Sequence, residues 1–517
     1  MVLLLTSTFI PTHIPVADAA VYLNWRLDVT ENGEFITAFA HLYGTPQMER
    51  HNRSFCRVEL DAKDADLPDS GIIEVSVGDY AQPVREAWEV TEKRVYSFSL
   101  NPAFTEKLAT VTSPTPVTVD LKITGKDGVQ RYADSRTIQL LPINYYAWVL
   151  GEADRRTLSP VLSTPHAEPI PRILGVAAKA TPFNAMLGYQ EQQGYSHYEV
   201  VDSQIRAVYN VLQSLGVTYV SSAAAFSSTR AQRVRLPVQT LTDRGGNCIE
   251  TTLLFSSLLE ALGLNVYYVF VTGHVFIAVD EWPDSEMVLP LETTMLGSGT
   301  YDEARRTGTE AYRNAKDDQS YLVVDVAEVR RAGITPTSYM DKMPEPARFY
   351  QELDRISEEI NAVSEMLRRY RDLTSDGAST PQAAEERYRN AERLFNDGKY
   401  REAKIEAGEA ISMVKPDGRP TPTPKPAFLT GESAETALGL AVITVPVILV
   451  VLAVVYARSR RRRVTPATPI MAPISARPAT PPVPPAYVQP PPAQRFCLEC
   501  GRQIPQAEHF CKYCGAK

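Results

Sequence analysis

The sequence predicts a multidomain membrane protein with, in chain order, an all-β sandwich, an α+β domain, an α-helical bundle, a single transmembrane helix and a small cysteine-rich domain. The chain has 517 residues, more than a single hydrophobic core usually holds. Residues 437–457 are apolar and uncharged, and four of the six cysteines form two close pairs near the C-terminus. With 44% hydrophobic residues and a formal net charge of −8, the composition gives no reason to expect a nucleic-acid partner.

Residues 1–20, "MVLLLTSTFIPTHIPVADAA", are predicted to be a signal peptide. They contain a short apolar run followed by Ala17-Asp18-Ala19, which suits a signal peptidase. A positively charged start is missing, because the first charged residue is Asp18. The alternative is that this segment is the first strand of the domain that follows.

Residues 21–145 are predicted to form a β-sandwich. In "VTVDLKIT" (117–124), apolar and polar residues alternate, as they do in a strand with one buried face. "YLNWRLDV" (22–29) shows the same alternation, and "ENGE" and "GKDG" are typical turn sequences. Several such runs favour a sandwich that serves as an accessory or binding module.

Residues 146–335 are predicted to form an α+β domain. In "VVDSQIRAVYNVLQSLG" (200–216), the apolar residues lie on one helical face and a glycine ends the pattern. A second apolar helix is expected up to Leu262. Three strand-like runs follow at 266–271, 274–280 and 288–294, which predicts an antiparallel meander.

Residues 345–415 are predicted to form a helical stalk. Apolar residues spaced alternately four and three apart make a heptad stripe, which consists of Phe349, Leu353, Ile356, Ile360, Val363, Leu367 and Tyr370. Two further helices are expected on either side of Asn396-Asp397-Gly398. The stripe belongs either to an intramolecular bundle, which we favour, or to a coiled coil that joins two copies of the chain.

The C-terminal part of the sequence predicts a membrane anchor. Residues 416–436 form a proline-rich spacer, and residues 437–457 have the length that a transmembrane helix needs. Residues 458–495, a basic and proline-rich linker, begin with an arginine block that favours the cytoplasmic side. We therefore expect a single-pass protein of the cell membrane, with extracytoplasmic N-terminal domains and a cytoplasmic C-terminus.

Residues 496–517 are predicted to bind zinc. The four cysteines form two C-x2-C pairs separated by ten residues; they are Cys497, Cys500, Cys511 and Cys514. Four thiolates on two tight turns suit the tetrahedral coordination of Zn²⁺, and two disulfides are disfavoured in the reducing cytoplasm. The segment resembles the zinc-ribbon family, which implies a structural Zn²⁺ and a site that can bind a cytoplasmic protein partner.

The α+β domain contains a second cysteine motif, "RGGNCIETTLLF" (244–255). We expect Cys248 at the start of a helix, where backbone N–H groups favour a thiolate, and we expect the two glycines to turn the chain and expose the sulfur. Glu250 in the first helical turn would oppose the thiolate. Other interpretations are a buried apolar cysteine and a disulfide between Cys248 and Cys56.

Two later motifs supply partners for a nucleophilic thiol. "TGHVF" places His274 at the start of a strand, and "LPLETT" places Glu292 on the next strand. A base beside the thiol and a carboxylate behind the base make the arrangement of a cysteine nucleophile. Pairing of the two strands would bring His274 and Glu292 together.

"RGGNC", a helix, "GHVF" and "LPLETT", in this order, resemble the transglutaminase-like superfamily, which has a papain-like fold. The resemblance covers about residues 195–300, and "LLPINYYAW" and "ETTMLGSGTYDEA" resemble its bacterial and archaeal envelope members. It implies that Cys248 is the nucleophile, His274 the general base and Glu292 the orienting acid, with no cofactor in this domain. The third position is most often aspartate in the family, whereas Glu292 is one methylene longer.

These motifs lead to two functional hypotheses. The first is a membrane-anchored cysteine peptidase or acyl transferase that acts on peptides or envelope polymers outside the cell. The second is a catalytically silent module that binds such polymers, with the zinc ribbon mediating protein interactions. The outcome of an acyl-enzyme, hydrolysis or transfer, depends on whether water or an amine reaches it.

Overall fold

The computed structural model describes residues 20–414, except 47, 49–52, 65–66, 151–152, 155, 222–230, 284, 286, 320, 338–345 and 376–379, together with 495–496 and 503–504. Residues 1–415 form one compact unit and residues 416–517 another. Among the described residues, no helix is long and apolar enough to cross a membrane. Residues 1–19, the predicted span 437–457 with its flanking linkers, and the four C-terminal cysteines lie outside the described residues.

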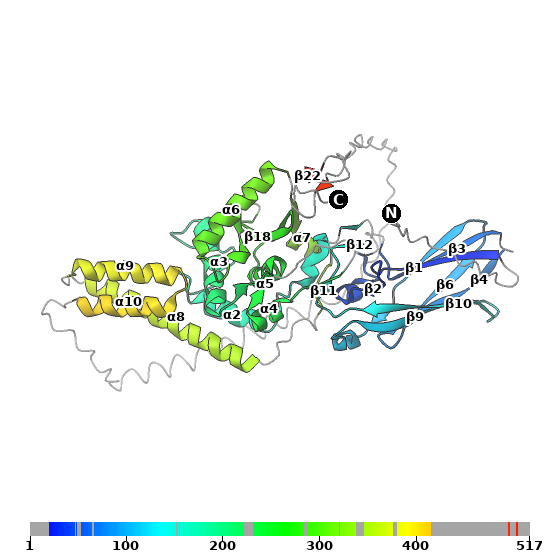
Figure 1. Cartoon of the computed structure of the whole chain (residues 1–517), viewed down its shortest axis with the longest axis horizontal. Coiled ribbons are helices and arrows are strands. Elements are labelled where there is room, and N and C mark those ends of the chain that lie inside the picture. The colour runs from blue at the N-terminus through cyan, green and yellow to red at the C-terminus, as the bar shows by residue number, and fades with distance from the viewer. Residues whose placement is uncertain are drawn as a thin grey trace, which may run out of the picture. The chain divides into compact units, whose positions relative to one another are not determined.

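The N-terminal part of the first unit contains two main sheets (Figure 1). One sheet has the order β1 (Ala20–Leu27), β3 (Cys56–Asp64) and β7 (Val95–Leu100). The other has the order β2 (Glu34–Phe35), β10 (Gln130–Leu140), β9 (Thr115–Gly125), β4 (Asp69–Val77) and β6 (Val84–Val90). β5 (Ala81–Gln82) pairs with β8 (Ala103–Phe104), and the 3-10 helices η1 (Thr37–Leu42) and η2 (Glu106–Thr110) lie between strands.

The two sheets share one hydrophobic core. In β9, every second residue is buried, as the alternation in "VTVDLKIT" predicts. The ring of Trp25 on β1 is buried, and its Nε1 donates a hydrogen bond of 2.8 Å to Asp134 on β10. The guanidinium group of Arg136 lies 4.0 Å from the centre of the same ring, so both polar and apolar contacts join the two sheets.

The second part is built around a four-stranded antiparallel sheet with the order β19 (Val288–Leu291), β18 (His274–Asp280), β17 (Val266–Val271) and β20 (Leu322–Asp325). Its helices are α2 (Pro169–Ala178), α3 (His197–Ser214), α4 (Pro237–Asp243), α5 (Cys248–Ala261), α6 (Tyr301–Asp317) and α7 (Val326–Arg331). Val275, Ile277 and Val279 of β18 share a core with the apolar residues of α5. Phe276 and Ala278 point to the other face and pack with residues of α6. The two helices therefore cover opposite faces of the sheet.

Short strands complete this part of the chain. β11 (Tyr145–Tyr146) pairs with β15 (Gln232–Arg233), and β14 (Thr218–Tyr219) pairs in parallel with β16 (Gly245–Gly246). β12 (Val149–Leu150) pairs with β13 (Ala153–Asp154), and the 3-10 helices are η3 (Arg156–Leu162) and η4 (Thr293–Met295). The pair of β14 and β16 matters for the site, because β16 immediately precedes α5.

The heptad stripe lies on α8 (Pro346–Ser375), which packs with α9 (Gln382–Asn396) and α10 (Tyr400–Met413). All seven stripe residues are buried within the chain, and the first four join the core of the α+β part. Asn210 Nδ2 on α3 also donates a hydrogen bond of 2.8 Å to the carbonyl oxygen of Asn396. The described chain thus covers its own stripe, which favours the intramolecular bundle over the coiled coil between two copies.

Candidate active site

Cys248 is the first residue of α5, where the motif predicts the start of a helix. Asn247 caps this helix, because its Oδ1 accepts a hydrogen bond of 3.1 Å from the N–H group of Glu250. The Glu250 carboxylate in turn accepts one of 2.8 Å from the N–H group of Asn247. This reciprocal pair is a capping box, and it fixes the direction in which the chain enters the helix. The thiol therefore lies at the positive end of the helix dipole.

The two glycines that precede Asn247 and Cys248 have a different role from the expected one. Both lie in β16, and a Cβ atom on Gly245 would be 2.7 Å from Cγ2 of Val220. A Cβ atom on Gly246 would be 3.0 Å from Cβ of Glu250. A larger side chain at either position would therefore push a neighbouring side chain aside. Cys248 is only 5% exposed, so the prediction that the glycines expose the sulfur is wrong.

Glu250 does not present a free charge to the thiol. Its Oε1 accepts a hydrogen bond of 2.8 Å from the backbone N–H group of Arg235, and its Oε2 lies 3.1 Å from Nη1 of the same arginine. The carboxylate is 2% exposed and is matched by one cation and two backbone donors. Arg235 was not identified from the sequence as the partner of Glu250. The capping box could have been recognised, because Asn247 and Glu250 have the spacing that it requires.

His274 begins β18, and Glu292 follows β19 and caps η4. β18 and β19 are antiparallel, with Ile277 opposite Leu291. The imidazole Nε2 lies 2.8 Å from Oε2 of Glu292, which is 6% exposed. The other oxygen, Oε1, accepts hydrogen bonds of 3.1 Å from the N–H group and 2.6 Å from the hydroxyl of Thr294. Both carboxylate oxygens are therefore held in place.

The thiol of Cys248 lies within hydrogen-bonding reach of the His274 imidazole. Because Nε2 is engaged with Glu292, Nδ1 is the ring nitrogen that is available to the thiol. Burial of the ring opposes its charged form, but the contacts with Cys248 and Glu292 outweigh burial and raise the pKa of His274 to about 10. Burial likewise opposes the ionised form of Glu292, and the contacts with His274 and Thr294 lower its pKa. The structure thus brings together the three residues that the motifs single out.

A buried pair of threonines joins α5, which begins with Cys248, to η4, which Glu292 caps. The hydroxyls of Thr251 on α5 and Thr293 on η4 lie 2.9 Å apart. The Thr251 hydroxyl also donates a hydrogen bond of 3.0 Å to the carbonyl oxygen of Asn247. Because both threonines are fully buried, this contact fixes the first turn of α5 relative to η4. No spacing rule in the sequence relates these two residues.

The alternative disulfide between Cys56 and Cys248 is not formed. Both cysteines are free and buried, and Cys56 lies on β3 of the N-terminal sheets. Burial raises the pKa of the Cys56 thiol to about 12, although Arg136 nearby opposes the shift. Cys56 is therefore an unreactive part of the hydrophobic core.

Within the described part of the chain, no group of three or more histidine, cysteine or acidic residues is placed to hold a metal ion. The predicted zinc ligands Cys497, Cys500, Cys511 and Cys514 are outside that part. The two-residue strands β21 (Arg495–Phe496) and β22 (Gln503–Ile504) pair antiparallel, and the first C-x2-C pair lies between them in the sequence.

The chain was compared with known proteins at three levels. No protein-family model matches it. No curated protein and no solved structure matches it either. The function is therefore argued from the residues of the site and from their geometry.

Proposed function

We propose that the α+β part is a cysteine-dependent amide hydrolase or acyl transferase of the transglutaminase-like type, acting on peptides or envelope polymers outside the cell. The observation that carries the proposal is the chain of contacts from Cys248 through His274 to Glu292, with the imidazole 2.8 Å from the carboxylate. A nucleophile, a base and an orienting acid in this order form an acyl-transfer site.

The contacts suggest how the reaction proceeds. The His274 imidazole takes the proton of the Cys248 thiol, and the sulfur attacks the carbonyl carbon of an amide. N–H groups at the start of α5 favour the negative charge that develops on the carbonyl oxygen. His274 then protonates the amine as the C–N bond breaks, which leaves a thioester on Cys248. Water or a second amine attacks the thioester, and the thiol is regenerated.

An electrophilic thiol probe that carries an amide recognition group tests this proposal. We expect it to modify Cys248 in the purified full-length protein, as located by peptide mass spectrometry. The His274→Ala variant should react about 10²–10⁴-fold more slowly, because it lacks the base. His166→Ala is the matched control, since His166 is exposed, and it should react like the wild type.

One observation favours the second candidate, a module that binds without turnover. Cys248 is 5% exposed, which leaves little thiol surface for a substrate to reach. In that case the probe would leave Cys248 unmodified in the wild type, and the enzyme proposal would be abandoned.

We further propose a single-pass membrane topology with a cytoplasmic zinc ribbon that can bind a protein partner. The uncharged stretch 437–457 and the arginine block after it support the topology. The pairing of β21 with β22 supports the ribbon, because the two strands flank the first C-x2-C pair in the sequence. Native mass spectrometry of the full chain should find one zinc ion, and a Cys500→Ala variant should bind it far more weakly.

A further inference from the structure

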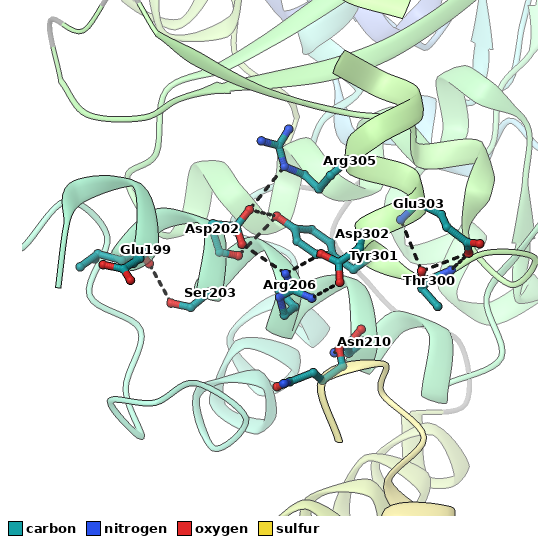
Figure 2. A network of polar contacts seen from close by, with 12 residues as sticks. Glu199, Asp202, Ser203, Arg206, Asn210, Thr300, Tyr301, Asp302, Glu303 and Arg305 are labelled. Atoms are coloured by element: carbon teal, nitrogen blue, oxygen red, sulfur yellow. Dashed lines mark hydrogen bonds and ion pairs between the residues drawn. The ribbon is translucent and has the colours of Figure 1, made fainter. Parts of the chain in front are cut away.

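Arg305 on α6 joins three elements through its guanidinium group, and Figure 2 shows its contact with Asp202. Its Nε lies 3.4 Å from Oδ1 of Asp202 on α3, and its Nη1 donates a hydrogen bond to the carbonyl oxygen of Pro290 on β19. Asp202 Oδ1 also accepts a hydrogen bond of 2.7 Å from the hydroxyl of Tyr301, the first residue of α6. One half-buried arginine therefore connects α3, α6 and β19.

A second arginine completes the network. Arg206 on α3 binds both carboxylate oxygens of Asp302 at 3.0 and 2.7 Å, and its Nη2 lies 3.6 Å from Asp202 Oδ2. Asp202 is 8% exposed and Tyr301 is 1% exposed. A buried carboxylate is tolerated when cations and hydrogen-bond donors surround it, and here two arginines and a phenol do so (Figure 2). The start of α6 is thus held firmly against α3.

The same end of α6 holds the segment that carries the acid. The backbone N–H group of Glu292 donates a hydrogen bond of 3.1 Å to the carbonyl oxygen of Ala304, in the first turn of α6. Arg305 binds the carbonyl oxygen of Pro290, two residues before Glu292. The backbone on both sides of Leu291 is therefore attached to α6. The position of the Glu292 carboxylate depends on where α6 lies.

We infer that Arg305 and Asp202 are positioning residues that hold Glu292 against the His274 imidazole. This inference rests on the proposed function, because it assigns the network a role in the Cys248 site. Neither residue contacts His274, so both act through the backbone of β19 and the first turn of α6. A network that served stability alone would not affect the protonation of His274.

The test measures the His274 imidazole directly. The full-length protein is labelled with ¹³C in the histidine rings, its histidine resonances are titrated by NMR, and His274 is assigned from the His274→Ala variant. In Arg305→Met we expect the pKa of His274 to fall from about 10 by about one pH unit, because the carboxylate is no longer held at hydrogen-bonding distance. Arg313→Met, at an exposed position two turns along α6, is the matched control and should leave the titration unchanged.

Two further variants make the outcome decisive. Arg305→Lys keeps a cation near Asp202 but lacks the second nitrogen that reaches Pro290, so we expect a smaller fall. If Arg305→Met does not fold, Arg305→Lys serves as the test variant in its place. Glu292→Gln separates the two claims. If it lowers the pKa of His274 while folded Arg305→Met and Arg305→Lys do not, the inference is overturned and the proposed site stands. If Glu292→Gln leaves the titration unchanged, the ion pair of the proposed function is itself wrong.

Discussion

Replacing Glu292 with glutamine is expected to slow acylation of Cys248 by about 10²–10⁴-fold without unfolding the protein. The carboxylate accepts the N–H group at Nε2 of His274, which leaves Nδ1 free to take the proton of the thiol. Thr294 donates two hydrogen bonds to Oε1, so the glutamine would place its oxygen there and turn its NH2 group towards His274. That group favours the tautomer with the proton on Nδ1, which cannot accept a proton from Cys248.

The same variant should change the dependence of the rate on pH. Once the thiol has passed its proton to His274, the resulting imidazolium has a pKa near 10, so at neutral pH it keeps the proton that the leaving amine needs and loses it only as the pH rises through about 10. Without the Glu292 carboxylate, one of the contacts that raise this pKa is absent. The alkaline fall in rate should therefore move to lower pH, which a pH series of acylation rates measures.

A matched glutamate and a shorter acid complete this test. Glu310 is exposed on α6, and Glu310→Gln should behave as the wild type does. Glu292→Asp is one methylene too short to bind both His274 and Thr294, so we expect a loss smaller than that of Glu292→Gln. An unchanged rate and pH profile in Glu292→Gln would show that Glu292 does not orient the imidazole.

Gly308→Ala is expected to lower the free energy of unfolding by about 1–3 kcal/mol, the usual effect of overpacking. Gly308 is buried in α6, and a Cβ atom there would be 2.8 Å from the backbone nitrogen of Glu292 and 2.9 Å from the Cα of Leu291. Neither backbone atom can move aside as a flexible side chain could. The helix must shift away from β19, so acylation of Cys248 should also slow.

The control variant for this prediction should be more stable than the wild type, not less. Gly175 is an exposed glycine of α2, and a Cβ atom there would meet nothing within 4 Å. Alanine is the better helix former, so Gly175→Ala should raise the thermal midpoint, in line with a gain of about 0.5–1 kcal/mol. The thermal midpoints of both variants are measured by thermal unfolding. A Gly308→Ala protein as stable as Gly175→Ala would contradict the close contact between α6 and β19.

Much of the local structure follows from patterns in the sequence. The predicted strands 266–271 and 274–280 have the bounds of β17 and β18, because each is a short apolar run bounded by turn residues. α5 begins at Cys248, where the two glycines and the apolar run after them predict the start of a helix. The third strand is shorter than predicted: β19 ends at Leu291, because Glu292 caps η4 instead of continuing the sheet.

Contacts between distant segments could not be predicted in this way. Asp202 and Arg305 are far apart in the sequence, and only the packing of α3 on α6 makes them partners. Arg235 compensates the charge of Glu250 from a segment with no motif of its own. Gly308 interrupts no pattern in its helix, and its need for a small side chain arises from the backbone of β19. The residues of the proposed triad leave a signal in the sequence, whereas the contacts that hold their backbone in place depend on the tertiary fold.

The central claim is that Cys248 forms an acyl-enzyme with His274 as its base. Intact-protein mass spectrometry after rapid mixing with an activated acyl substrate tests it most directly. We predict an adduct of the mass of the acyl group, located on Cys248 and released by hydroxylamine, and we predict that its formation slows strongly in His274→Ala. An acyl adduct that is absent from Cys248, or that forms at the same rate in His274→Ala, would contradict the account.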